Sequence, residues 1–552
     1  MPEWLIDILR YNPEKPLIFT GLYFWGFFAI VLTVYSIIYK QRALRNAFLF
    51  FASLFFYYKT SGFFFIILLF STLADYLIGH GIYHSKSALG RKFLVGLSVL
   101  VNLCILGYFK YAYFFADFVS DVFGVEITVI NHFALWTNEL TGSDFIWERI
   151  MLPVGISFFT FQTISYSVDI YRGLIKPVKN ILDFGFYVSF FPQLVAGPIV
   201  RAADFVPQLY EKYKLTKEQF GMALFWILNG LLKKMFLADY IAVNFVDRVF
   251  ANPLSFSGFE NMMALFGYSL QVYADFSGYT DIAIGVALLL GFRLPINFNS
   301  PYKAVSVGDF WRRWHISLST WLRDYLYIPM GGNRSGSFFS YFMMFVVIFF
   351  VSLLAQSWYV PVAFAGVVFV VYLLTRFSPA FRRWTDTNIN LMLTMLLGGL
   401  WHGSSWNFVI WGGLNGLGLV VYKLWKGISP WGDKSKWYNR MIGITTTLVF
   451  ITFTRTWFRG ESFELSAQML SQIGTNFNAA IIPDVLWGFR FPFLVMLLGY
   501  IIHWVPVKTK DWYKKTFVEF PLVVKILVAF LAIFFIYQVL SADLQPFIYF
   551  AF

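Results

Sequence analysis

The sequence contains very little charge and almost no cysteine. Charged residues make up 13% of the 552 residues, about half of what soluble globular proteins carry, so an ordinary soluble domain is excluded. The single cysteine, Cys104, excludes an internal disulfide framework and a cysteine-based metal site, and its place in an apolar run indicates simple packing. Walker loops, dinucleotide-binding fingerprints, serine-elbow motifs and metal-ligand spacings are also absent, so no bound cofactor is expected.

Apolar and aromatic residues are correspondingly abundant. They make up 58% and 22% of the chain, and the mean hydropathy is +0.63. These values exclude disorder and indicate an integral membrane protein, in which aromatic rings fill the helix bundle and anchor both interfaces. The net charge of +13 is attributed to basic cytoplasmic loops, so membrane lipids are expected as partners and nucleic acid is not.

The charged loops predict how the chain crosses the membrane. Basic loops at residues 40–45 and 86–92 are assigned to the cytoplasm, whereas residues 117–149, with six acidic residues and one basic residue, are assigned outside. The apolar run at residues 17–39 is too long for a signal core and predicts a membrane span. Further cytoplasmic loops are expected at residues 172–179, 233–234, 303–334, 376–383, 423–440 and 508–515.

Two long apolar stretches are predicted to break near their centres. Residues 384–422 are just long enough for two crossings, and their centre at residues 398–406 is polar and rich in glycine. Residues 335–375 behave similarly, with Gln356 and Pro361 near the middle. The fold class is therefore an all-α polytopic membrane protein, a single domain over residues 1–552 with roughly eleven to fourteen apolar segments, some tilted, broken or re-entrant.

His402 is the first candidate for catalysis. It lies at the predicted break, where non-helical backbone is tolerated at membrane depth only if protein or a water-filled cavity surrounds it. Trp401 and Trp406 can wall a pocket there, and an imidazole can take a proton from a hydroxyl group. The alternative is a buried histidine satisfied by a neighbouring helix. The remaining histidines apart from His315 are predicted to be interfacial: His80, His84, His132 and His503.

His315 is the second candidate. If residues 309–325 form one helix, His315 lies on an apolar stripe with Trp311 and Trp314 and faces inward, and Asp309 can cap the helix start. The alternative is an interfacial helix in which the histidine bonds a backbone carbonyl.

Several charged residues near these motifs have two interpretations. Arg312 and Arg313 offer a cytoplasmic face that attracts phosphates, or they meet lipid headgroups. For Asp275 and Asp281, structural ion pairs are favoured over a catalytic dyad, because a spacing of six places them on different helix faces. Lys110 is predicted to snorkel or to pair at a boundary.

Five segments resemble successive blocks of the membrane-bound O-acyltransferase family. They are residues 151–162 (MLPVGISFFTFQ), 192–198 (PQLVAGP), 275–281 (DFSGYTD), 310–324 (FWRRWHISLSTWLRD) and 401–403 (WHG). Their order and spacing also fit, and they define a motif core at about residues 151–422.

Within the family, residues 311–317 and 327–334 are most similar to the bacterial alginate O-acetyltransferase branch, which includes cellulose and peptidoglycan acetylation proteins. The flanking spans, at residues 17–118 and 441–552, are not assigned by any motif.

The resemblance implies tilted helices around a central funnel, with His402 and His315 as the catalytic residues. It also implies transfer of an acyl group, acetyl by analogy, across the bacterial inner membrane. The expected co-substrate is acetyl-CoA or an acylated carrier protein. The expected acceptor is a hydroxyl of an extracytoplasmic polysaccharide or envelope polymer, reached through a periplasmic acetyltransferase or esterase-like partner. Residues expected to bind substrate are Trp401, Trp406, Asn407, Ser404, Arg312, Arg313, Trp311, Trp314 and Asp275.

Two other classes remain open. A secondary transporter or lipid flippase also uses broken helices and intramembrane carboxylates, although it would show two corresponding halves, which the sequence lacks. A non-catalytic scaffold of an envelope assembly is the third hypothesis.

Overall fold

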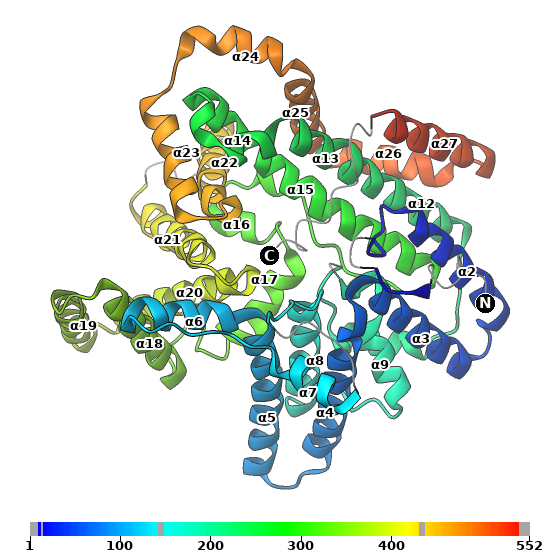
Figure 1. The fold of residues 1–552 in the computed structure, drawn as a ribbon, viewed down its shortest axis with the longest axis horizontal. Helices are drawn as coiled ribbons and strands as arrows, with labels where there is room; N and C mark the ends of the chain where they lie inside the picture. Colours follow the sequence, from blue (N-terminus) through cyan, green and yellow to red (C-terminus); the bar gives the residue numbers. More distant parts are fainter. Residues whose placement is uncertain (1–8, 13–14, 142–147, 196, 430–435, 540–552) are drawn as a thin grey trace.

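The computed structural model describes residues 9–12, 15–141, 148–195, 197–429 and 436–539, and nearly all of them lie in helices (Figure 1). The N-terminal part consists of α2 (Leu22–Ile38), α3 (Arg42–Ser61), η1 (Gly62–Phe64), α4 (Phe65–His84), α5 (Ala88–Leu106), η2 (Gly107–Tyr111), α6 (Ala112–Phe123), α7 (His132–Thr141), α8 (Ile156–Tyr171), α9 (Ile181–Ser189), α10 (Phe191–Leu194) and α11 (Ala202–Leu209).

The middle of the chain contains α12 (Lys217–Leu231), η3 (Leu232–Ala238), α13 (Asp239–Ile241), η4 (Ala242–Val246), α14 (Asp247–Ala251), η5 (Pro253–Ser255), α15 (Gly258–Leu289), η6 (Pro301–Lys303), α16 (Val307–Trp311), α17 (Ile316–Leu322) and η7 (Arg323–Tyr327).

The C-terminal part contains α18 (Phe338–Ala355), α19 (Tyr359–Phe377), α20 (Pro379–His402), α21 (Trp406–Ile428), α22 (Trp437–Arg459), α23 (Phe463–Thr475), η8 (Ala479–Ile481), α24 (Ile482–Gly488), α25 (Arg490–Trp504), α26 (Val507–Glu519) and α27 (Leu522–Val539).

The helices are those of a polytopic membrane protein. Within the described residues, seven are long and apolar enough to cross a membrane, or up to nine if two bent pairs each count as one span. This is fewer than the roughly eleven to fourteen apolar segments expected from their length. Part of the difference arises because consecutive helices count as one span, as in Arg42–His84 with 43 residues and Ala88–Phe123 with 36, and part because other apolar segments form bent pairs. The pairs α24–α25 and α26–α27, for example, bend by 89° and 118°.

The central helix of the fold is α15, which the neighbouring helices surround (Figure 1). Its two aspartates are both paired. Asp275 lies 2.6 Å from the Lys234 ammonium, and Asp281 lies 2.7 Å from that of Lys233. Because a buried charge needs a partner of opposite sign, these pairs link α15 to η3. The structural ion-pair interpretation is therefore confirmed.

The predicted break at residues 398–406 is confirmed. α20 ends at His402, and α21 begins at Trp406. The two helices cross where Gly399 meets Gly412: a Cβ atom on Gly399 would lie 2.3 Å from the carbonyl oxygen of Phe408. The glycines therefore allow the two backbones to approach closely and bring His402 against α21.

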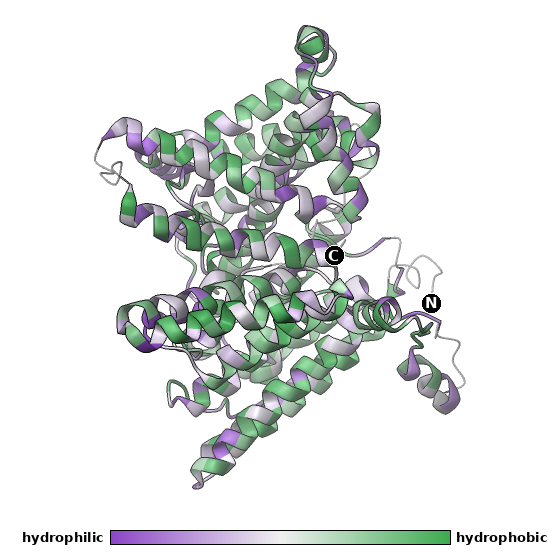
Figure 2. Ribbon diagram, turned by 90° about the vertical axis from the view of Figure 1, so that its left-hand side faces the viewer, coloured by the Kyte–Doolittle hydropathy of each residue, from purple (hydrophilic) through white to green (hydrophobic). Residues whose placement is uncertain are grey.

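The second predicted break is also confirmed. α18 ends at Ala355. The next residue, Gln356, has a left-handed φ of 46°, and α19 follows. No residue of α19 is buried, and its Val, Leu and Phe side chains are exposed. Apolar residues also cover much of the outer helices in Figure 2. Such surfaces are stable only against lipid, so these helices form part of the membrane-facing perimeter.

Two predictions about single residues are wrong. Cys104 is exposed on α5, although simple packing was expected. His503 was expected at an interface, but it is 3% exposed and its Nε2 accepts a hydrogen bond from the Tyr302 amide over 3.1 Å. The apolar packing of α25 against η6 therefore encloses a histidine that sequence alone assigned to water.

Candidate active site

His315 and His402 lie beside each other in the interior of the protein. Their ring centroids are 6.3 Å apart, and their side chains are 0% and 2% exposed. His402 is the last residue of α20, and His315 directly precedes α17, so the pair forms where these two helices meet in the middle of Figure 1. The structure thus brings together the two histidines that the sequence selected.

The segment that carries His315 is not one helix. Residues 309–325 were predicted as a continuous helix, but the chain forms α16 and α17, and His315 between them has φ 44° and ψ 56°. Asn297 explains the break. Its backbone and side-chain oxygens accept hydrogen bonds from the first two amides of α17, both over 3.0 Å. The inward orientation of His315 is correct, because this turn directs its ring into the core.

The two arginines of this segment are held at the surface by Asp309. Arg313 Nε lies 3.1 Å from the Asp309 carboxylate and Arg312 Nη2 lies 3.8 Å from it, with the Arg312 side chain 75% exposed. Asp309 was predicted to cap the helix start, but Ser306 is the N-cap of α16. The Ser306 hydroxyl accepts a hydrogen bond from the Asp309 amide over 3.2 Å. The arginines therefore contribute charge near the surface rather than direct contacts to the histidines.

Aromatic rings enclose both histidines. The His402 ring lies 5.0 Å from those of Trp401 and Trp411 and 5.3 Å from that of Phe458. Trp401 also contacts His315 over 5.8 Å. These indole and phenyl faces exclude bulk water from the imidazoles, which strengthens any hydrogen bond or charge interaction made there.

Three of the predicted substrate-binding residues face elsewhere. The Trp406 ring packs on Phe114 of α6 at 4.9 Å. Asn407 donates a hydrogen bond to the Gly460 carbonyl over 2.8 Å, and Ser404 is exposed at the turn between α20 and α21. These side chains shape the turn that follows His402.

Of the other predicted substrate-binding residues, the tryptophans belong to the aromatic group around the pair, whereas Asp275 is held in an ion pair. Trp311 contacts Trp411 over 5.6 Å, which joins it to the aromatic group around His402. Trp314 is 1% exposed and lies beneath the guanidinium of Arg455. Asp275 is in the buried ion pair of α15 described above.

Lys110 reaches the backbone of the candidate catalytic residue. Its ammonium donates hydrogen bonds to the carbonyls of Trp401 and His402, over 2.6 and 3.2 Å, and the Tyr111 hydroxyl donates to Leu400 over 2.6 Å. Lys110 was expected to snorkel or to pair at a boundary, but it is 8% exposed. The last carbonyls of α20 have no partners within the helix, and the lysine supplies one with the charge that complements the helix dipole.

Arg455 is the second residue that the sequence interpretation missed. It is 1% exposed in α22, with its guanidinium carbon 4.5 Å from the Trp314 ring and 5.0 Å from the Phe458 ring. The signal was present, because Arg455 is the only charged residue in the apolar stretch 441–458.

A charged cluster borders the site where η7 begins. Asp324 pairs with Arg201 at 2.7 Å and with Arg323 at 2.6 Å, and the Asp324 carbonyl accepts a hydrogen bond from Arg172. Burial raises the pKa of Asp324, but the hydrogen bonds from both paired arginines outweigh it and hold the pKa below its usual value. The cluster thus combines one ionised carboxylate with three guanidinium groups.

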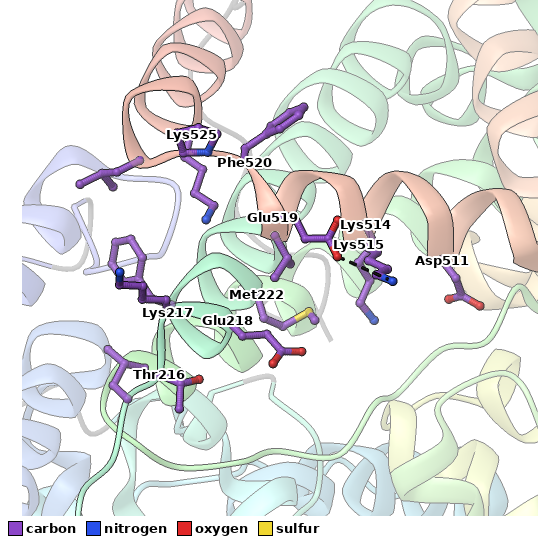
Figure 3. A pocket seen from close by; sticks show the side chains of 15 residues that line it. Thr216, Lys217, Glu218, Met222, Asp511, Lys514, Lys515, Glu519, Phe520 and Lys525 are labelled. Carbon is purple, nitrogen blue, oxygen red and sulfur yellow. Dashed lines mark ion pairs between the residues drawn. The ribbon is translucent and has the colours of Figure 1, made fainter.

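Two cavities lie apart from the histidine pair. One, of about 1220 Å³, lies between the start of α12 and the bend of α26 and α27 (Figure 3). The other, of about 470 Å³, lies between α21 and α22 and reaches Ser306 at the start of α16. Neither is lined by His315 or His402. The charged residues that line the first cavity are Lys217, Glu218, Asp511, Lys514, Lys515, Glu519 and Lys525.

Comparisons with known proteins point to one family. The model described as "MBOAT, membrane-bound O-acyltransferase family" matches residues 100–354. The "Probable alginate O-acetylase AlgI" of Azotobacter vinelandii is 39% identical over 328 residues, which cover 59% of this chain and 52% of that protein. The corresponding protein of Pseudomonas syringae pv. tomato is 34% identical, covering 82% and 73%.

The "Peptidoglycan O-acetyltransferase" of Helicobacter pylori is 31% identical over 502 residues, covering 85% of this chain and 81% of that protein. The chain spans only about half the length of the Azotobacter vinelandii relative. The similarity extends beyond the part that the family model matches, since the Helicobacter pylori alignment covers most of both chains.

Proposed function

The chain belongs to the membrane-bound O-acyltransferase family, and on that premise we propose that it is an O-acyltransferase, most directly an O-acetyltransferase. It takes the acyl group from a cytosolic thioester and passes it across the bacterial inner membrane to hydroxyls of an extracytoplasmic polysaccharide or envelope polymer. The names of the relatives, alginate O-acetylase and peptidoglycan O-acetyltransferase, support acetyl transfer to polymers.

The buried histidine pair is the observation that carries this proposal. Both ring nitrogens of His315 are buried and make no hydrogen bond to a described residue. Buried polar atoms of this kind are rarely left without a partner, which favours a ligand beside the ring. With the His402 ring only 6.3 Å away, a thioester that lies alongside the pair would be close to both rings.

In the proposed reaction, His402 acts as the general base. Its imidazole takes the proton of the acceptor hydroxyl as the oxygen attacks the thioester carbonyl, and a carbon–oxygen bond forms. The carbonyl electron pair moves onto the oxygen and then returns as the carbon–sulfur bond breaks. The thiolate leaves toward the cytoplasm with the proton from His402. His315 orients the thioester from the cytoplasmic side.

The surroundings supply the remaining parts. Arg201, Arg323 and Arg172 offer positive charge for the phosphates of coenzyme A or of a carrier-bound phosphopantetheine. We further propose that a periplasmic acetyltransferase or esterase-like partner completes the transfer and docks on residues 117–149. Of these, residues 142–147 lie outside the described part of the chain.

The test follows acetyl-labelled acetyl-CoA with protein in lipid nanodiscs. We expect His402→Ala to lower thiol release and label transfer by about 100-fold or more, since a positioned general base contributes on that scale. His84→Gln, at an exposed histidine, is the matched control and should retain activity.

Turnover that persists in His402→Ala would refute the assignment of the base. If the wild-type protein is inactive with acetyl-CoA, an acylated carrier protein and a periplasmic partner are added. A transporter or flippase would move its substrate without releasing any thiol under either condition.

A further inference from the structure

Arg455 is a buried cation that stacks on Trp314 and Phe458 but has no carboxylate partner among the described residues. None of its three guanidinium nitrogens makes a hydrogen bond of good geometry to a described residue, although the Tyr302 hydroxyl interacts with the guanidinium. A charge removed from water is unfavourable unless it is paired and hydrogen-bonded. The buried charge of Arg455 is therefore unfavourable in the free protein, and an anion bound to the guanidinium would lower its free energy.

A second buried arginine shows the usual arrangement. Arg45 is 2% exposed, and its guanidinium donates hydrogen bonds to the carbonyls of Leu209 and Glu211 and to the Asn46 side chain. The chain thus supplies one oxygen acceptor to each of the three nitrogens of this buried guanidinium. Arg455 has no such carbonyl acceptor among the described residues, which favours a role in binding an anion.

Arg455 lies next to the candidate catalytic histidine. The Phe458 ring contacts both residues. Its centroid lies 5.0 Å from the guanidinium carbon of Arg455 and 5.3 Å from the centroid of the His402 ring. Trp314, which lies directly before His315, forms the other support of the guanidinium. The charge of Arg455 also acts on the His402 imidazole. A group that reacts at His402 would therefore bring its oxygens within reach of Arg455.

We propose that Arg455 binds an anionic oxygen of the reacting complex beside His402. This inference rests on the proposed acyl transfer. A guanidinium presents a rigid fork of donors that matches such oxygens, and in a site without water each of these bonds is strong. Two sources share this chemistry: the oxyanion formed when a hydroxyl adds to the thioester carbonyl, and the carboxylate of an acidic sugar acceptor.

The first experiment compares stability with turnover. In Arg455→Met, we expect thioester turnover to fall about 100-fold, in the range seen when an oxyanion donor is removed. The unfolding temperature in nanodiscs should stay equal or rise, because an unpaired buried charge is gone. Arg455→Lys, which keeps the charge without the fork, should lose less activity.

The matched control is Arg45→Met. It should lower the unfolding temperature, because it leaves the carbonyls of Leu209 and Glu211 without their donor. If Arg455→Met destabilises the protein as Arg45→Met does, or if its turnover equals that of the wild type, the proposal is overturned.

The acceptor then distinguishes the two sources of the anion. A loss in Arg455→Met with water and a neutral sugar as acceptors assigns the guanidinium to the oxyanion. A loss confined to a hexuronic acid oligosaccharide assigns it to the acceptor carboxylate.

Anion binding is also measured without turnover. This separates a failure of the anion-binding proposal from a failure of the proposed acyl transfer. Sodium acetate, compared with sodium chloride at equal ionic strength, should raise the unfolding temperature of the wild type and of His402→Ala but not that of Arg455→Met. Equal shifts in all three proteins would overturn the proposal even if acyl transfer is established.

Discussion

At the scale of single residues, Lys110 connects one π-helical turn to the end of the helix that carries His402. The last carbonyls of a helix carry partial negative charge and have no partners inside it. Lys110 and Tyr111 together donate to three successive carbonyls, at residues 400, 401 and 402. Together, these hydrogen bonds fix the orientation of the end of α20 and therefore the position of the His402 imidazole.

Replacing Lys110 with Met should therefore reduce both stability and activity. Two buried carbonyls lose their donor, a change of about 1–3 kcal/mol each when no water replaces it. We expect a lower unfolding temperature in nanodiscs and slower thiol release. Lys92→Met, at an exposed lysine of α5, is the control. Unchanged stability and turnover in Lys110→Met would show that the ammonium does not hold α20 in place.

At the scale of helices, the crossing of α20 and α21 determines where the histidine pair can form. A Cβ atom on Gly412 would lie 2.4 Å from the Met395 carbonyl oxygen, and the same atom on the adjacent Gly413 would meet only a leucine side chain at 3.5 Å. A backbone atom cannot move aside as a side chain can. A side chain larger than hydrogen is therefore expected to be tolerated at Gly413 but not at Gly412.

Gly412→Ala should consequently separate the helices and displace His402. Overpacking of this kind destabilises by about 1–3 kcal/mol. Thiol release should fall along with the unfolding temperature. Gly413→Ala differs by one position on the same helix and should leave both quantities nearly unchanged. Equal behaviour of the two variants would contradict the close crossing.

The sequence predicts the interruptions of the apolar stretches well. Glycines and polar residues inside an apolar stretch are local signals, and they locate the break before Trp406 and the one at Gln356. The break at His315 has no such signal, because Asn297 imposes it from another segment of the chain. Periodicity over residues 309–325 describes a helix that this contact prevents.

The candidate site likewise combines features with local sequence signals and features that depend on distant segments. His402 and His315 could be selected by residue type and position, but the aromatic rings around them come from several helices. Lys110 and Arg455 each stand out as a charge in apolar sequence, yet their contacts to α20 and to Phe458 depend on the tertiary fold.

At the scale of the whole molecule, several tertiary contacts agree with the sides assigned from charge, but the cytoplasmic loop predicted at residues 233–234 is wrong, because Lys233 and Lys234 lie inside the helical span Lys217–Ala251 and pair with α15. Segments expected in the cytoplasm contact one another: Arg91 donates to the Tyr171 carbonyl and Tyr76 to that of Lys179. Gln356, at the far end of α18, donates to the Asp121 carbonyl in the segment expected outside. The two groups of loops therefore lie where one consistent orientation would place them.

Cysteine labelling tests this orientation directly. In a Cys104→Ala background, the chain has no other cysteine, so each new one reports alone. A membrane-impermeant maleimide added to spheroplasts should label Glu461→Cys, whose native side chain is 82% exposed. It should not label Lys86→Cys until the cells are opened. The reverse pattern would invert the assigned topology.

The left-handed backbone conformation of His315 affects how substitutions at this position are interpreted. Alanine adopts that conformation at a penalty of about 1–2 kcal/mol, whereas glycine adopts it freely and asparagine does so more readily than alanine. Since histidine also carries a Cβ atom and already adopts this conformation, His315→Ala removes the imidazole but retains the backbone strain of the turn before α17. His315→Gly and His315→Asn remove the ring with less strain, and the difference between them and His315→Ala measures the contribution of backbone geometry separately from that of chemistry.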